Sequence, residues 1–275
     1  MKTRISTTLL IAVLSITSVI AQTKETRNVS VFTKISFRVP GKLYLKQGSP
    51  QKVEIEGKKD VLEEIETEVD GNRLIIGKEG NGWMNWSWGN NDDDQVNVYI
   101  TVKDIEGLSV SGSGDLIGQG KITSSDLDLN VSGSGSLQLE AAVNGDVEAN
   151  VSGSGEIVLK ASCKNYESDV SGSGRIELDV VISDKADFGV SGSGKIQASG
   201  TANEIKTSIS GSGKVLAANL EVNKCDVRIS GSGDVEINVK SELDANISGS
   251  GSVSYKGNPS HVNSHASGSG KVSKM

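Results

Sequence analysis

Short segments in which apolar and polar residues alternate recur along most of the chain. In one of them Leu127, Leu129 and Val131 alternate with polar residues, and Leu137 and Leu139 continue the alternation after a Ser-Gly-Ser-Gly motif. Alternation with a period of two is typical of a β-strand that buries one face. Each such unit therefore predicts two short strands with Ser-Gly-Ser-Gly between them and a second, variable connection that closes the unit.

The Ser-Gly-Ser-Gly motif recurs at nearly constant spacing. Its first serines are Ser111, Ser132, Ser152, Ser171, Ser191, Ser210, Ser230, Ser248 and Ser267. A Gly/Ser linker would not keep a spacing of 18 to 21 residues or the same apolar flanks. One unit cannot bury its apolar faces alone, so we expect the units to stack with their strands paired in parallel. The sequence thus predicts an all-β fold: a parallel β-helix or solenoid of the pectin-lyase-like kind, with two facing sheets and about nine coils.

The glycines of the motif are expected to form the tight corner between the two sheets. Such a corner favours a positive φ, which glycine adopts at little cost, and it must stack on the corners above and below. The predicted turn residues are Gly112, Gly114, Gly133, Gly135, Gly153, Gly155, Gly172, Gly174, Gly192, Gly194, Gly211, Gly213, Gly231, Gly233, Gly249, Gly251, Gly268 and Gly270. Parity places the glycines inward or on the bend and the serines outward, where their hydroxyls are hypothesised to form a ladder.

Residues 22–105 lack the motif but keep the alternation. Val96, Val98, Ile100 and Val102 run up to the first repeat. We interpret 22–105 as a β-rich N-terminal cap that is continuous with the solenoid of 106–275, without a flexible linker between them.

Residues 1–21 are typical of a signal peptide. Lys2 and Arg4 precede an apolar stretch that is too short to span a bilayer, and Val19-Ile20-Ala21 resembles a cleavage site. Cleavage would move the formal net charge from −7 to −9. We therefore expect an exported protein of the periplasm, cell surface or extracellular space, with no membrane-spanning segment after cleavage and no binding to nucleic acid.

The start of the mature chain, read together with the repeats, resembles a known family. Val31-Phe32 and Ile35 to Phe37 follow the form Val-Phe-x-x-Ile-x-Phe, and serial Gly-Ser-Gly units come after them. This layout is similar to the head GIN-domain family of auto-transporter adhesins, common in Bacteroidetes. The resemblance implies a two-sheet β-superhelix with tight turns and a role in adhesion or surface interaction.

All three tryptophans, Trp83, Trp86 and Trp88, fall within six residues. Flat aromatic faces stack on sugars and dominate many interfaces, so these residues are candidate ligand contacts. The alternative is a hydrophobic plug, because Trp86 and Trp88 share parity and could cover the open end of the core. The sequence leaves both interpretations open.

No pattern of catalytic or metal-ligating residues emerges. His261 and His265 lie where a loop returns to a strand, and Asp92 to Asp94 are expected to form a solvated turn. Cys163 and Cys225 lie three units apart, about 14 Å, whereas a disulfide needs Cα atoms within about 7 Å. We therefore predict no catalytic residues, no metal, no disulfide and no cofactor.

These patterns favour a non-catalytic, exported interaction protein. The expected partner is a glycan or a surface protein, bound through the repetitive solenoid or the tryptophans. The alternative is a structural protein of the cell envelope that acts by self-assembly or stacking, as a homo-oligomer.

Overall fold

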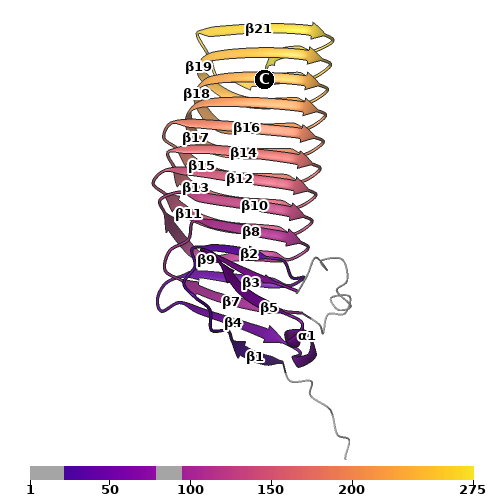
Figure 1. Ribbon diagram of the computed structural model, residues 1–275. Helices are drawn as coiled ribbons and strands as arrows, with labels where there is room; N and C mark the ends of the chain where they lie inside the picture. The colour runs from indigo at the N-terminus through magenta and orange to yellow at the C-terminus, as the bar shows by residue number, and fades with distance from the viewer. Residues whose placement is uncertain (1–21, 79–94) are drawn as a thin grey trace, which may run out of the picture.

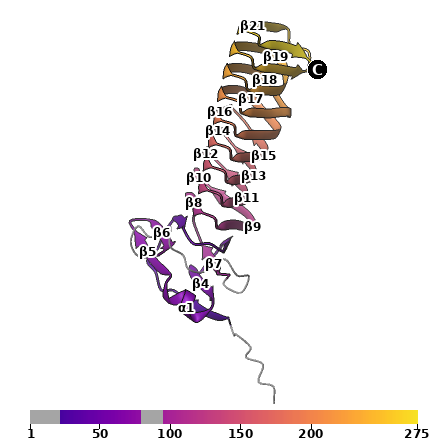
Figure 2. The same cartoon turned by 90° about the vertical axis from the view of Figure 1, so that its right-hand side faces the viewer.

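The computed structural model of the chain describes residues 22–78 and 95–275 and confirms the parallel β-solenoid. The nine Ser-Gly-Ser-Gly corners stack along a rod of about eight turns (Figure 1). The rod stands on a wider N-terminal part that contains the short helix α1 (Lys59–Glu63) (Figure 2).

Two facing sheets form the rod. The first sheet carries, in order along the rod, β5 (Glu66–Asp70), β6 (Arg73–Gly77), β2 (Lys34–Phe37), β8 (Gly107–Gly112), β10 (Leu127–Gly133), β12 (Asp146–Gly153), β14 (Asn165–Gly172), β16 (Lys185–Gly192), the second halves of β17 (Lys195–Gly211), β18 (Lys214–Gly231) and β19 (Asp234–Gly249), and β21 (His261–Gly268). From β8 onward these strands lead into the Ser-Gly-Ser-Gly corners. The second sheet carries β1 (Thr23–Thr26), β4 (Lys52–Gly57), β7 (Asn97–Val102), β3 (Lys42–Gln47), β9 (Asp115–Ser124), β11 (Ser136–Val143), β13 (Glu156–Cys163), β15 (Arg175–Ile182), the first halves of β17 to β19, β20 (Ser252–Lys256) and β22 (Lys271–Lys274). Strands β17 to β19 run through the second corner without a break and so link the sheets.

Pairing between the repeats is parallel and joins equivalent positions, whereas the pairs β1–β4, β4–β7 and β5–β6 at the N-terminal end are antiparallel. Val131 pairs with Val151, and Leu137 pairs with Ile157. These four side chains are buried between the sheets, and the alternate residues along each strand face outward. The alternation in the sequence is therefore the alternation between core and solvent.

The two glycines of the motif are required for different structural reasons. The first, such as Gly133, takes a positive φ of 112° at the bend. The second, such as Gly155, is buried, and a Cβ there would lie 2.5 Å from Cγ1 of Val131. Conformation excludes other residues from the first position, and packing excludes them from the second.

The N-terminal part joins the rod in an order that differs from the chain order. Strands β2 and β3 pair in parallel with β8 and β9, the first repeat. On their other side they pair with β6 and β7. The strand from Asn97 to Val102 thus precedes the first repeat in sequence but lies one rung further from it, because residues 34–47 are inserted between them.

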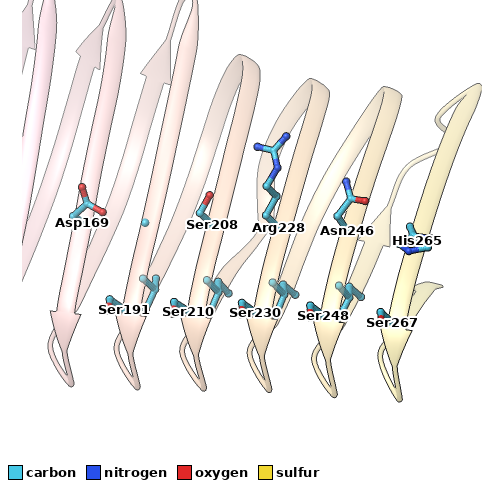
Figure 3. A pocket seen from close by; sticks show the side chains of 15 residues that line it. Asp169, Ser191, Ser208, Ser210, Arg228, Ser230, Asn246, Ser248, His265 and Ser267 are labelled. Carbon is cyan, nitrogen blue, oxygen red and sulfur yellow. The ribbon is translucent and has the colours of Figure 1, made fainter.

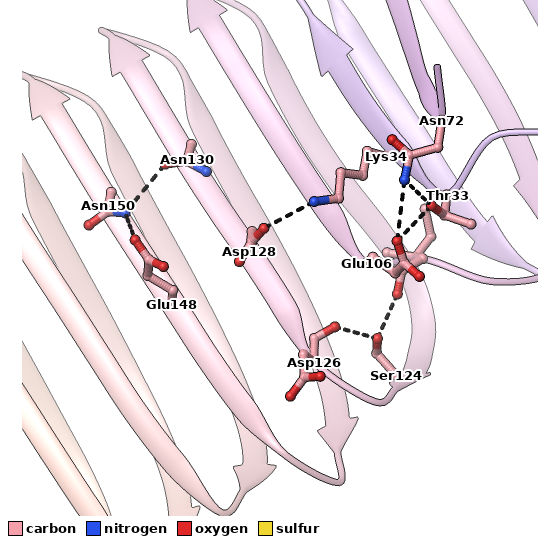
Figure 4. A network of polar contacts seen from close by, with 11 residues as sticks. Thr33, Lys34, Asn72, Glu106, Ser124, Asp126, Asp128, Asn130, Glu148 and Asn150 are labelled. Carbon is pink, nitrogen blue, oxygen red and sulfur yellow. Dashed lines mark hydrogen bonds and ion pairs between the residues drawn. The ribbon is translucent and has the colours of Figure 1, made fainter. Parts of the chain in front are cut away.

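Polar contacts support this junction (Figure 4). The Thr33 hydroxyl donates to Glu106 at 2.8 Å, and the Asn72 amide donates to Thr33 at 3.1 Å. Lys34 reaches Asp128 in the second repeat at 3.4 Å. Side chains from three separate segments of the chain therefore hold the inserted rung against the solenoid.

Candidate functional site

Because equivalent residues stack at each rung, outward side chains form columns along the rod. One column lies two residues before the first serine of each motif, and a second column consists of the serines themselves. Over the last six repeats of the first sheet the first column is Asp169, Gly189, Ser208, Arg228, Asn246 and His265 (Figure 3). Strand pairing, and not sequence proximity, brings these side chains into one line.

A groove of about 560 Å³ runs between the two columns. Its walls are two residues apart along each strand, about 7 Å. Its floor is lined by Val190, Ile209, Ile229 and Ile247, whose side chains point into the core. From Asp169 to His265 the groove spans five rung intervals, about 24 Å.

The first column offers hydrogen-bonding groups of mixed kind. Arg228 donates to Asp226 on its own strand at 2.9 Å, which places the guanidinium at the outer rim of the first column, on the side away from the serines (Figure 3). The carboxylate of Asp169 extends over Gly189, since a Cβ at that glycine would lie 1.9 Å from Asp169 Oδ1. Burial, followed by the nearby carboxylates of Asp187 and Glu148, raises the pKa of Asp169. The groove therefore combines donors and acceptors without a strong net charge.

A second hollow on the same sheet, of about 1150 Å³, is strongly acidic. It is lined by eleven Asp and Glu residues and only three lysines. Each lysine is paired with a carboxylate on a neighbouring rung, as Lys206 is with Asp187 at 3.2 Å. This face repels polyanions.

The second sheet carries a hollow of about 620 Å³ where the pairing is irregular. The register shifts between Gln138 and Glu140, and again between Gln197 and Ser199. Bulges of this kind bend a strand and redirect its side chains.

The residues singled out in the sequence fall in separate places. Trp83, Trp86 and Trp88 lie outside the described residues, as does the segment 1–21, so both interpretations of the tryptophans stay predictions. Cys163 and Cys225 are free and buried. Burial raises the pKa of the Cys163 thiol to about 11 and also raises that of Cys225.

The motif serines lie at the surface, apart from the half-buried Ser111. Within residues 22–78 and 95–275 no hydrogen bond joins their hydroxyls between rungs. The corners are instead tied by the backbone: the amide of Ser154, for example, donates to the carbonyl of Gly133 at 2.8 Å. The serine hydroxyls therefore remain available to a ligand.

The described part of the chain offers neither a metal site nor a membrane-spanning helix. It contains no group of three or more His, Cys, Asp or Glu side chains placed to hold a metal ion. No helix in it has the length and apolar character needed to cross a bilayer.

The sequence analysis placed the serines outward but missed the residues of the first column, apart from His265, which was considered only as a metal ligand. A usable signal was present: aligning the repeats on Ser-Gly-Ser-Gly places Asp169, Arg228 and His265 in one column. Side-chain size at each rung decides which columns enclose a hollow, as the small Gly189 does here. The position of the groove could therefore be found only from the structure.

The family described as "Putative auto-transporter adhesin, head GIN domain" matches residues 31–198 and 176–259. These two ranges cover most of the chain. The chain belongs to the head GIN-domain family. As a member of this adhesin family, it is expected to be exported or surface-exposed and to lack catalysis. No curated protein matches the chain.

Solved structures share this architecture. A putative adhesin from Parabacteroides distasonis is 25% identical, with a TM-score of 0.66 over 93% of this chain and 97% of that chain. A putative lipid binding protein from the same species is 23% identical, with a TM-score of 0.68 over 92% and 96%. A putative adhesin from Parabacteroides merdae is 20% identical, with a TM-score of 0.64 over 92% and 96%. At these identities the last two are similar to this head GIN-domain protein in fold alone.

Proposed function

We propose that this head GIN-domain protein is a non-catalytic, exported adhesin that binds a linear, neutral polysaccharide along the groove of its first sheet. The observation that carries the proposal is the groove itself, which has a serine on one wall at each rung and, except at Gly189, a side chain on the other wall. A ligand that repeats along its length can make an equivalent contact with the serine wall at successive rungs, which a compact ligand cannot.

The chemistry of the groove favours a chain of sugars. Serine hydroxyls on one wall and Ser208, Arg228 and Asn246 on the other can exchange hydrogen bonds with sugar hydroxyls. The floor is the flat backbone of these strands, whose polar groups are used in the pairing between rungs, and it can lie against the C–H faces of sugar rings. A polyanionic chain is disfavoured because the acidic hollow adjoins the groove on the same sheet.

A panel of neutral and uronate-containing linear polysaccharides, tested by array and then by calorimetry, provides the experiment. Ser208→Trp fills the middle of the groove and is expected to abolish binding without lowering the melting temperature. Arg228→Ala is expected to weaken binding about tenfold, the loss of roughly one charge-assisted hydrogen bond.

Ser254→Trp is the matched control, because Ser254 faces outward on the second sheet, away from the groove. Binding that survives Ser208→Trp, or that Ser254→Trp removes equally, would overturn the proposal. A preference for the uronate-containing chains would also contradict it.

A further inference from the structure

The last rung of the solenoid has an unpaired edge. Strand β21 pairs with β19 and β22 pairs with β20 on one side only. Within residues 22–78 and 95–275 no strand pairs with their other side. Every residue of β21 is exposed, including the apolar Val262, at 41%.

The backbone groups at this edge can be assigned from the ladder. The amide of Asp128 donates to the carbonyl of Glu106 in the rung below. Stepwise pairing from rung to rung places Asn263 at the position of Asp128. In a parallel ladder, alternate residues bond to opposite neighbours. Asn263 therefore faces β19, whereas Val262, Ser264 and Ala266 direct their backbone groups to the free edge.

This edge lacks the features that prevent edge-to-edge pairing. Such features include charged side chains, proline and bulges. Strands β1 and β5, the outer strands at the other end of the rod, carry Lys24, Glu25, Glu66, Glu68 and Asp70. Strand β21 contains no Lys, Arg, Asp, Glu or Pro and pairs with β19 in unbroken register. Of the outer strands at the two ends of the rod, β21 is thus the one without such a charge, whereas β22 beside it carries Lys271 and Lys274.

We propose that β21 pairs antiparallel with β21 of a second copy, so that two rods join end to end in a closed dimer. The strand is self-complementary about Ser264. In this register Val262 lies opposite Ala266 of the partner on the core side, and Asn263 lies opposite His265 on the outer side, with no like-charged Lys, Arg, Asp or Glu facing each other. A two-fold axis through Ser264, perpendicular to the sheets, satisfies both edges at once and stops assembly at two copies.

The same axis brings β22 beside its own copy. Strand β22 carries Lys271 and Lys274, whose like charges oppose pairing there, so the pairing of β21 is the contact that holds the dimer. The side chain of Lys274 is held within its own chain by Asn258.

The experiment is sedimentation or light scattering over a wide concentration range, with X-ray scattering for shape. Wild-type protein is expected to form a dimer whose longest dimension is nearly twice that of the monomer. Ser264→Pro removes an edge amide that the ladder to β19 does not use, and it should give monomer at concentrations where wild type is dimeric. Ser264→Ala keeps that amide and should remain dimeric.

Ala266→Lys provides a second test by placing a charge on the core side of the edge. It too should give monomer, with a melting temperature close to that of the wild-type monomer. A wild-type protein that stays monomeric at all concentrations would overturn the proposal. So would a side-by-side dimer, or a dimer that both Ser264→Pro and Ala266→Lys retain.

Discussion

Gly153 stacks so closely on Gly133 that a Cβ added to Gly153 would lie 2.7 Å from the Gly133 carbonyl oxygen. That oxygen also accepts the amide of Ser154, so it cannot withdraw without breaking a bond between rungs. Each corner of the rod therefore constrains the next one.

Gly153→Ala is expected to lower the free energy of unfolding by about 1–3 kcal/mol or more, because a positive φ and a backbone clash act together. Ser152→Ala, at an exposed position of the same corner, should change it by less than about 0.5 kcal/mol. Denaturant unfolding measures both. Equal effects for the two variants would mean that the corner is not under this constraint.

Tyr166 and Phe188 form an edge-to-face pair in the core, with ring centroids 5.9 Å apart. The tyrosine hydroxyl is buried near that of Ser168, and among the described residues neither hydroxyl makes a hydrogen bond. Tyr166→Phe should therefore leave the melting temperature unchanged or raise it, since an unsatisfied polar group is removed. Phe188→Ala should cost about 3–5 kcal/mol because it leaves a cavity. Val181→Ala, at a site 59% exposed, is the control and should have little effect.

The thiols of Cys163 and Cys225 should be unreactive in the folded protein at pH 8. Both are buried, and burial raises the pKa of Cys163 to about 11, so little thiolate is present at that pH. Iodoacetamide followed by mass spectrometry should label neither cysteine before unfolding and both afterwards. Rapid labelling of folded protein, or a mass two units low, would contradict this prediction.

Asp169 should make stability depend on pH. Its pKa is raised in the folded state, so folding favours the protonated form, and its contribution to stability falls as pH rises through the ordinary Asp range to the raised value. Asp169→Asn should therefore raise the melting temperature at pH 7, and the difference should shrink toward pH 3. Asp179→Asn, on the second sheet, is the control. If Asp169→Asn instead lowers the melting temperature at pH 7 and approaches wild type toward pH 3, folding stabilises the carboxylate and the prediction is wrong.

The repeats could be assigned from the sequence because every repeat must bury the same apolar positions, so the same pattern recurs many times. Val131 and Val151 sit at equivalent positions, and each must face the core for either unit to be stable. The N-terminal part carries no such repetition. The pairing of β2 with β8 joins residues about seventy positions apart, and nothing in the alternation around Ile35 or Leu43 specifies which strand lies beside them.

The sequence by itself determined the parallel solenoid, its corners and its core, since periodic burial and the demands of glycine act locally and recur at every rung. Only the tertiary structure decided the insertion of residues 34–47 between β7 and the first repeat, the groove from Asp169 to His265, and the free edge of β21. These depend on which side chains and backbone groups from distant segments meet, or fail to meet, a neighbour. That outcome is set by the packing of the whole chain and is not encoded in any one repeat.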